Sequence, residues 1–252
     1  MASNHKAALE SRVLSGPPPA CAAARVIDFK ETEVKEYADY FAMVINDILM
    51  PEECAELVSL AQPAHNAPWP PAKMTAYNGS QILDPSSRHC GRIIYNSKAV
   101  ADRLLNRILP HLPPEVATLD NVPDITGQMP VIRKEKWKIS RFNEALKFLK
   151  YERGNCFRPH CDAHYEDKET GEKSSLTAHF YLNGGNRGED TVEGGATRFA
   201  VDFADPNAGK VDVNPKAGSV LIFQQRDMYH EGAGVNKGVK YTMRADVMYK
   251  KV

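Results

Sequence analysis

The sequence lacks several features that would assign it to a class at once. No apolar run approaches the ~20 residues that a bilayer-spanning helix needs, so we expect no membrane segment. Lys plus Arg number 32 and Asp plus Glu number 32, so the formal net charge is zero. A nucleic-acid-binding protein would be expected to carry a basic surplus or stripe, and we therefore expect no nucleic-acid partner.

Cysteine is scarce as well, and its pattern argues against two further classes. The five cysteines are odd in number and show no C-x-x-C spacing, which fits neither a disulfide framework nor a zinc ribbon. Residues 1–25 contain no compact apolar stretch of the kind that a secretory signal needs. We therefore expect a protein of a reducing compartment, with the cytoplasm as its location.

What is present divides the chain into three parts. Residues 1–25 are rich in Ala and Ser and are interrupted by prolines at 17–19, and we interpret them as a disordered tail. Residues 26–252 are expected to form a single domain. In it, a mostly helical layer over about 26–140 supports a β core over about 141–252.

Two helices are predicted in the helical layer. Pro51 followed by acidic residues is a helix-start signature, and this helix should continue through Leu60. Apolar residues at i, i+4, i+5 and i+8 predict a second helix over about 97–109. A strand-like segment at 41–48 precedes both, and the basic segment 133–141 is interpreted as a solvated helix or loop face.

A long Pro-rich stretch, 62–89, separates the two predicted helices and contains Trp69 and Tyr77. A loop of that length inside a compact domain is usually functional or disordered. We interpret it either as a lid over an active site or as a plain surface excursion.

After about residue 143 the sequence changes to short alternating segments separated by Gly, Pro and Asn turns. Such a series predicts a β sandwich or barrel, and a jelly roll is one way to close it. The predicted strands are 145–151, 156–162, 175–183, 197–202, 219–223 and 239–249.

One short pattern in this β region has the spacing of a metal site. His160 and Asp162 are two residues apart, so on a strand both side chains would project to the same face and could bind one ion. His230 follows several predicted strands later and would complete the set. Two histidines and one carboxylate form the facial arrangement of non-haem Fe(II) oxygenases. Three protein ligands on an octahedral ion leave room for a chelating keto acid and O₂, whereas a zinc hydrolase would need only one open position.

The segments around these residues make the pattern more specific. They are PHCD at 159–162, GGATRF at 194–199, PKAGSVLIF at 215–223, and the ten-residue step from His230 to Lys240 within HEGAGVNKGVK. Together these motifs resemble the prolyl 4-hydroxylase-like branch of the 2-oxoglutarate/Fe(II)-dependent dioxygenases, over about 142–249. The resemblance implies an α+β fold: a double-stranded β-helix (a cupin-like jelly roll) supported by N-terminal helices.

The resemblance also implies roles for individual residues. It makes His160, Asp162 and His230 the iron ligands. It makes Lys240 the cation that pairs with the distal carboxylate of 2-oxoglutarate. Arg244 has the same strand parity and is the alternative anchor, because a bidentate guanidinium suits a carboxylate well. The other residues expected to contact 2-oxoglutarate are Tyr151, Tyr181 and Thr177.

The implied activity is hydroxylation of an unactivated C–H bond, in which 2-oxoglutarate and O₂ yield succinate and CO₂, with ascorbate as an optional reductant. Asp162 favours hydroxylation, because halogenating members of the family lack this carboxylate. A free amino acid or small metabolite is the expected substrate. A prolyl residue of a cytosolic protein is one alternative, and a non-catalytic jelly-roll binding protein is another. The residues expected near the substrate are Arg88, Arg92, Asn143 and Trp69.

Overall fold

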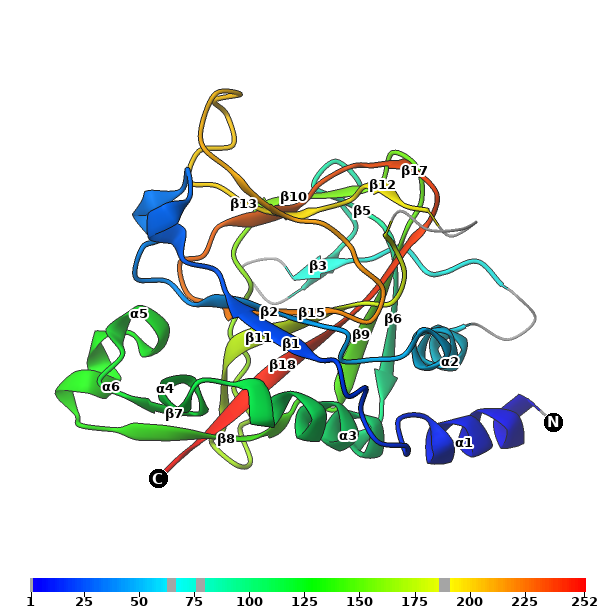
Figure 1. Ribbon diagram of the computed structural model, residues 1–252, viewed down its shortest axis with the longest axis horizontal. Helices are drawn as coiled ribbons and strands as arrows, with labels where there is room; N and C mark the ends of the chain where they lie inside the picture. Colours follow the sequence, from blue (N-terminus) through cyan, green and yellow to red (C-terminus); the bar gives the residue numbers. More distant parts are fainter. Residues whose placement is uncertain (1, 63–66, 76–79, 186–190) are drawn as a thin grey trace.

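Two β-sheets face each other, and helices from the N-terminal half cover the outer face of the larger sheet (Figure 1). The structure is a computed structural model that describes residues 2–62, 67–75, 80–185 and 191–252. The larger sheet has nine strands and the smaller has five. This arrangement confirms the predicted jelly-roll core with supporting helices.

The larger sheet has the strand order β1-β2-β15-β11-β18-β8-β7, and β9 pairs with both β18 and β6. Its strands are β1 (Ala23–Val26), β2 (Ala42–Asn46), β6 (Gly91–Asn96), β7 (Thr118–Asp120), β8 (Lys136–Phe142), β9 (Ala145–Tyr151), β11 (Lys173–Tyr181), β15 (Val220–Gln224) and β18 (Lys240–Lys251). The long β18 therefore lies at the centre of the larger sheet. Its alternate side chains project to the two opposite faces of that sheet.

The smaller sheet has the order β14-β13-β16-β10-β5. Its strands are β5 (Arg88–His89), β10 (Cys156–His160), β13 (Thr197–Phe199), β14 (Val211–Val213) and β16 (His230–Gly232). Two further pairs stand apart from both sheets: β3 (Met74–Thr75) with β4 (Gln81–Ile82), and β12 (Glu193–Gly194) with β17 (Val235–Lys237). The stretch 62–89 thus contributes β3, β4 and β5, and Tyr77 lies outside the described residues.

The helices are α1 (Ala2–Arg12), α2 (Pro51–Ala61), α3 (Lys98–Ile108), α4 (Pro114–Ala117), α5 (Pro123–Thr126) and α6 (Gln128–Ile132), with 3₁₀ turns η1 (Phe29–Glu31), η2 (Lys35–Tyr37) and η4 (Leu109–His111). Both predicted helices, α2 and α3, are confirmed. The Ser97 hydroxyl accepts a hydrogen bond from the Val100 amide at the start of α3, the usual way to satisfy a free N–H there. None of the helices in the described ranges is long and apolar enough to cross a membrane.

The expectation of a mostly helical layer over 26–140 is only partly right. Strands β6, β7 and the start of β8 fall in this region, and β8 replaces the helix or loop face expected at 133–141. Strand β6 pairs along its whole length with β9, from Gly91 opposite Lys150 to Asn96 opposite Ala145. This pairing joins segments that are distant in the sequence, so local periodicity could not reveal it.

The interpretation of residues 1–25 as a disordered tail is wrong for the first helix. In α1 and the turn after it, Leu9, Val13 and Leu14 are buried in the main hydrophobic core. The Arg103 guanidinium of α3 donates hydrogen bonds to the carbonyl oxygens of Glu10 (2.7 Å) and Val13 (2.9 Å). The helix is thus held by tertiary contacts rather than by a strong local pattern.

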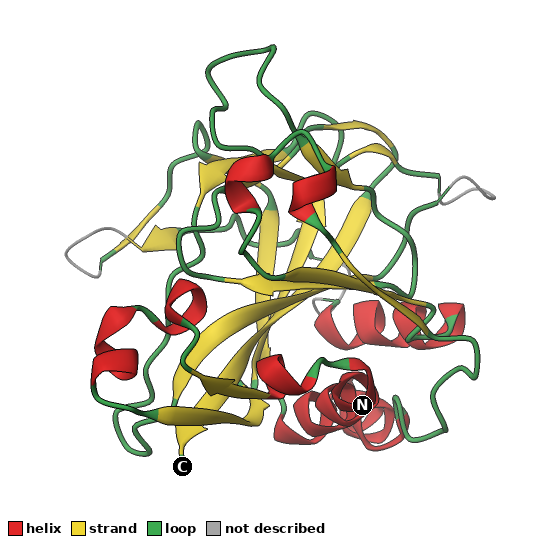
Figure 2. Ribbon diagram, turned by 60° about the vertical axis from the view of Figure 1, so that its left-hand side comes forward, coloured by secondary structure: helices red, strands yellow, loops and turns green. Residues whose placement is uncertain are grey.

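Strands β9, β11 and β18 carry apolar side chains on one face and polar side chains on the other. The first face packs against the helices through residues such as Phe148, Phe180, Met243 and Ala245. The second face points between the two sheets (Figure 2). It carries Lys147, Leu149 and Tyr151 of β9, Thr177, His179 and Tyr181 of β11, and Lys240, Thr242, Arg244 and Asp246 of β18. The space between the sheets is therefore lined with buried polar groups, which is where a functional site is expected.

Candidate active site

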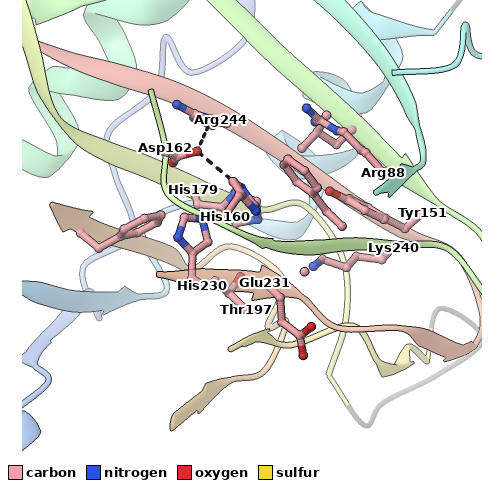
Figure 3. Close-up of a pocket in the computed structure, with 14 residues that line it drawn as sticks. Arg88, Tyr151, His160, Asp162, His179, Thr197, His230, Glu231, Lys240 and Arg244 are labelled. Atoms are coloured by element: carbon pink, nitrogen blue, oxygen red, sulfur yellow. Dashed lines mark hydrogen bonds and ion pairs between the residues drawn. The ribbon is translucent and has the colours of Figure 1, made fainter. Parts of the chain in front are cut away.

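His160, Asp162 and His230 meet between the two sheets, at the ends of neighbouring strands (Figure 3). One potential ligand atom from each lies within 4.8 Å of the other two. His160 on β10 pairs directly with His230 on β16, and their ring centroids are 4.4 Å apart. Strand β10 ends at His160, so Asp162 reaches the site from the segment after the strand. The expected strand over 156–162 is shorter than predicted, yet the three side chains still converge.

The two imidazoles are oriented by backbone carbonyl groups. The Nδ1 atom of His160 lies 2.8 Å from the carbonyl oxygen of Arg158, and that of His230 lies 3.0 Å from the carbonyl oxygen of Met228. A carbonyl oxygen only accepts, so each Nδ1 carries the proton and each Nε2 keeps a lone pair for a metal. Burial, reinforced by the nearby His230, lowers the pKa of His160 to about 3, which keeps this ring neutral near pH 7.

Both oxygens of the Asp162 carboxylate are held by the protein. Oδ1 accepts a hydrogen bond of 2.5 Å from Arg244 Nη1, and Oδ2 accepts one of 2.7 Å from the Thr177 hydroxyl. Burial alone would raise the pKa of Asp162, but Arg244 and the two imidazoles outweigh it and hold the pKa well below its usual range. The carboxylate is thus ionised and fixed. The Thr177 hydroxyl, which was predicted to contact 2-oxoglutarate, donates this hydrogen bond to Asp162.

A buried network supports these contacts from behind. Arg244 Nη2 lies 3.0 Å from Asp246 Oδ1, and Lys147 Nζ lies 2.5 Å from Asp246 Oδ2. The Gln225 amide donates to the Thr177 hydroxyl at 3.3 Å and to Asp246 at 3.4 Å. Arg244 is therefore paired with two carboxylates, which disfavours it as the free cation that would anchor 2-oxoglutarate.

The three potential ligands line a pocket that is partly open to solvent. Lys240 lines this pocket and is only 2% exposed. Its ammonium donates to the Gly195 carbonyl at 2.6 Å and has no carboxylate partner among the described residues. Burial lowers the pKa of Lys240 to about 8. Gly195 has a positive φ of +70°, and a Cβ there would lie 3.1 Å from Lys240 Cδ, so a glycine leaves room for the lysine chain.

The two predicted pocket tyrosines flank Lys240 but differ in their hydroxyl groups. The Lys240 ammonium lies 5.1 Å from the ring centroid of Tyr151 and 5.7 Å from that of Tyr181. Tyr151 lines the pocket. The Tyr181 hydroxyl contacts Thr197 Oγ1 at 2.8 Å and the Val213 carbonyl oxygen at 3.4 Å. Of the two tyrosines, Tyr151 is the one in the pocket lining.

Three buried polar atoms of the inner wall have no hydrogen-bond partner within the described part of the chain. They are His179 Nε2, Thr242 Oγ1 and Arg244 Nε. Leaving such atoms unpaired costs free energy, so they indicate a ligand or ordered water. An oxygen-rich dianion next to Lys240 would supply acceptors to this wall, so the residues present fit 2-oxoglutarate beside a ferrous ion.

Of the four predicted substrate residues, Arg88 lines the pocket. Arg92 is not in the lining, but it pairs with the lining residue Leu149 and so lies on the same face of the sheet. Trp69 lies on the face of β6 opposite to Arg92. A Cβ at Gly91, the residue before Arg92, would be only 2.6 Å from the Trp69 Cβ, and consecutive residues of a strand face opposite sides. It packs against Tyr241, with ring centroids 5.9 Å apart.

Asn143 is likewise remote from the pocket lining. The side-chain oxygen of Asn143 accepts a hydrogen bond of 3.1 Å from the backbone N–H of Ala145. The backbone N–H of Asn143 donates to the backbone carbonyl of Asp246. These contacts stabilise the turn between β8 and β9. The sequence indicated a polar residue near a strand end but could not separate a turn-forming role from substrate contact.

The pocket also contains aromatic residues to which the sequence gave no role. The His160 ring stacks on Phe157 with 3.6 Å between centroids, and the His230 ring lies 4.8 Å from Phe223. Thr197 and Glu231 complete this side. Thr197 lies in the GGATRF motif and Phe223 in the PKAGSVLIF motif. Strand parity within these two motifs could have indicated that their side chains point into the pocket. The aromatic rings limit water access around the imidazoles.

The fold and the site define a jelly-roll protein with a facial two-histidine, one-carboxylate arrangement. Residues 146–245, from β9 to β18, match the family model described as the 2OG-Fe(II) oxygenase superfamily. The chain thus contains a 2OG-Fe(II) oxygenase domain, and it is an enzyme of the non-haem Fe(II)/2-oxoglutarate-dependent class that uses Fe(II), 2-oxoglutarate and O₂. This excludes the non-catalytic binding protein that the sequence left as an alternative.

Solved structures with a similar arrangement include two prolyl hydroxylases. The viral collagen prolyl hydroxylase of Paramecium Bursaria Chlorella virus-1, in its 2OG complex, is 17% identical, with 82% of this chain and 95% of that chain covered and a TM-score of 0.46. A Pseudomonas putida prolyl-4-hydroxylase is 16% identical, with 84% and 95% covered and a TM-score of 0.47.

The epimerase SnoN from nogalamycin biosynthesis is also similar, at 16% identity, with 96% of this chain and 80% of that chain covered and a TM-score of 0.43. No curated protein sequence matches the chain. Likenesses this distant carry no argument about the substrate, which must be inferred from the pocket itself.

Proposed function

We propose that His160, Asp162 and His230 bind Fe(II) and that Lys240, helped by Tyr151, binds the distal carboxylate of 2-oxoglutarate. In this proposal the enzyme hydroxylates an unactivated C–H bond of a free amino acid or another small metabolite. The observation that carries it is Lys240: a buried ammonium without a carboxylate partner in the described chain, lining the same pocket as the three potential ligands. A buried unpaired cation is costly, and an anionic cosubstrate would complete its pairing.

Each residue of the site then has a defined task. Bound Fe(II) supplies the activation of O₂, and the overall reaction converts 2-oxoglutarate, O₂ and R–H into succinate, CO₂ and R–OH. Lys240 neutralises the distal carboxylate and sets the direction in which the keto acid enters. Thr177 and Arg244 hold the carboxylate of Asp162 in a fixed orientation. Phe157 and Phe223 exclude water from the imidazole side of the pocket.

The lining of the pocket supports a small polar substrate. Beside the three potential ligands it carries Arg88, Glu231 and Lys240, which can pair with charged or polar groups of a bound molecule.

The assignment of the metal ligands is tested by succinate release from 2-oxoglutarate, with Fe(II) and ascorbate present. We expect His160→Ala, Asp162→Ala and His230→Ala each to abolish it. His164→Ala is the matched control, because this exposed histidine follows Asp162 closely but bonds only to the Ser174 carbonyl. Succinate release that persists in His160→Ala would contradict the proposed iron site.

The substrate class is tested separately, by incubation with a panel of free amino acids and a panel of proline-rich peptides. The readout is a mass gain of about 16 Da, that of one inserted oxygen atom. We expect the gain in the amino-acid panel. A gain confined to the peptides would replace the proposed substrate with a peptidyl prolyl residue and leave the iron and cosubstrate assignments intact.

A further inference from the structure

The inner wall of the pocket carries more positive than negative charge. Strand parity places four cationic residues on this face, and Arg88 of β5 lines the same pocket from the opposite sheet. The four are Arg92, Lys147, Lys240 and Arg244. The acidic groups at this pocket are Asp162, Asp246 and Glu231. Arg244 pairs with Asp162 and Asp246, Lys147 pairs with Asp246, and Glu231 pairs with Arg198 of the smaller sheet. The other three cations have no carboxylate partner among the described residues.

Under the proposed function, one of the three has its partner assigned: Lys240 takes the distal carboxylate of 2-oxoglutarate. Arg88 and Arg92 are then left with positive charge that the cosubstrate does not neutralise. This wall can therefore accept a further anion.

Arg88 is held in place without a counter-ion. Its guanidinium carbon lies 4.3 Å from the ring centroid of Phe157, and its Nε lies 3.4 Å from the Cys90 sulfur. It forms no ion pair with any carboxylate in the described ranges. Stacking on an aromatic ring fixes the plane of a guanidinium and leaves its edge free to bind a carboxylate. Arg88 is thus pre-organised for an anion.

Arg92 is half-buried, and its side chain forms no hydrogen bond or ion pair with the described residues. Burial, together with the charges of Arg88 and Arg244, lowers the pKa of Arg92. Like charges near each other disfavour their charged forms, and an anion beside them would relieve this repulsion. On the other face of β6, Trp69 packs against Gly91, so the wall that carries Arg92 is supported from behind.

We propose that Arg88 and Arg92 form a carboxylate-binding subsite that holds the acid group of a small substrate beside the iron site. This inference rests on the proposed function and narrows it, because the substrate must then carry a carboxylate. Two guanidinium groups bind a carboxylate through charge-assisted hydrogen bonds, which give both affinity and a fixed orientation. The acid group would direct the rest of the molecule toward the metal.

The test uses the full chain with Mn(II) in place of Fe(II), together with 2-oxoglutarate, so that no turnover occurs. The probes are the proteinogenic L-amino acids and, separately, their carboxamides, observed through the broadening of their proton NMR signals by Mn(II). We expect at least one acid to be broadened and its amide to bind at least about tenfold more weakly. Arg88→Gln and Arg92→Gln should each weaken binding of that acid by about ten- to hundredfold, the usual effect of losing a charge-assisted hydrogen bond.

Arg153→Gln is the matched control, because Arg153 is exposed in the turn between β9 and β10, and its loss should leave binding of the acid as in the wild type. Three results would overturn the subsite: equal binding of acids and amides, broadening of no acid, or wild-type binding by both arginine variants.

Succinate release with Fe(II) and no added probe separates this inference from the proposed function. If the wild type releases none, the proposed function fails. If the wild type is active but Arg92→Gln raises the half-saturating 2-oxoglutarate concentration as much as Lys240→Met does, the arginines serve the cosubstrate and the substrate subsite is refuted. A rise seen only in Lys240→Met supports the subsite.

Discussion

The Arg244 guanidinium donates a 2.5 Å hydrogen bond to Asp162, a residue 82 positions away in the sequence. Through its second nitrogen it also contacts Asp246 at 3.0 Å. A potential metal ligand is thus tied to the central strand of the larger sheet. This contact explains how Asp162, which lies beyond the end of β10, keeps a fixed orientation.

Replacing Arg244 with lysine should weaken metal binding even though the charge is retained. Lysine cannot reach two carboxylates with the fixed fork of a guanidinium, so Asp162 would lose its orientation. We expect the dissociation constant for Mn(II), measured by titration calorimetry, to rise about 10- to 100-fold, the range typical of residues that orient metal ligands.

Arg141→Lys is the control for this substitution. Arg141 also joins two carboxylates, those of Asp167 and Glu172, at 2.6 Å each, but it lies away from the pocket lining. An equal loss of Mn(II) affinity in both variants would show that Arg244 has no particular role toward the metal.

The two tyrosines beside Lys240 should respond differently to removal of their hydroxyl groups. Tyr151→Phe is expected to raise the 2-oxoglutarate concentration for half-maximal succinate release about ten- to hundredfold, because a hydrogen bond to a charged ligand is lost. Tyr181→Phe loses the contacts with Thr197 and the Val213 carbonyl. It should lower the free energy of unfolding by about 1 kcal/mol and leave the cosubstrate requirement within about twofold. The reverse order of effects would assign 2-oxoglutarate to Tyr181.

Strand parity is the part of the site that the sequence predicted best. Alternation in 239–249 gave Lys240 and Arg244 the same parity, and in the structure both side chains lie on the same face of β18. The pairing of Arg244 with Asp162 could not be predicted in this way, because parity says which face a residue occupies and not which residue it meets. The same limit left Trp69 among the substrate residues, although it packs on the outside of β6.

The N-terminal helix shows a second kind of limit. Its segment has little amphipathic pattern, and its stability comes from contacts with α2 and α3 that composition does not encode. Leu9→Ala should therefore lower the free energy of unfolding, measured in urea, by about 2–5 kcal/mol, as for other buried leucines. Ser11→Ala on the exposed side of the same helix should change it by less than about 0.5 kcal/mol. Equal, small effects would mean that α1 contributes nothing to the core.

The charge of Lys240 should make the affinity for 2-oxoglutarate depend on pH. Burial lowers the pKa of this lysine to about 8 in the ligand-free protein, so it is mostly charged below that pH and mostly neutral above it. Both carboxylates of 2-oxoglutarate are ionised throughout the range from pH 6.5 to 9.5. His160, with its pKa lowered to about 3, stays neutral over the same range. Lys240 therefore changes its charge within this range.

Binding requires the ammonium form, so affinity should be constant below about pH 8 and fall by about tenfold for each further pH unit. Calorimetric titration of the Mn(II)-loaded protein with 2-oxoglutarate between pH 6.5 and 9.5 measures this directly. In Lys240→Met the affinity for 2-oxoglutarate should be weaker by about 10- to 100-fold at pH 7. Its plot against pH should no longer change slope near pH 8. Lys237→Met, at an exposed lysine paired with Glu193, should keep the wild-type profile. If the change of slope persists in Lys240→Met, another group controls the binding of 2-oxoglutarate, and the role given to Lys240 is wrong.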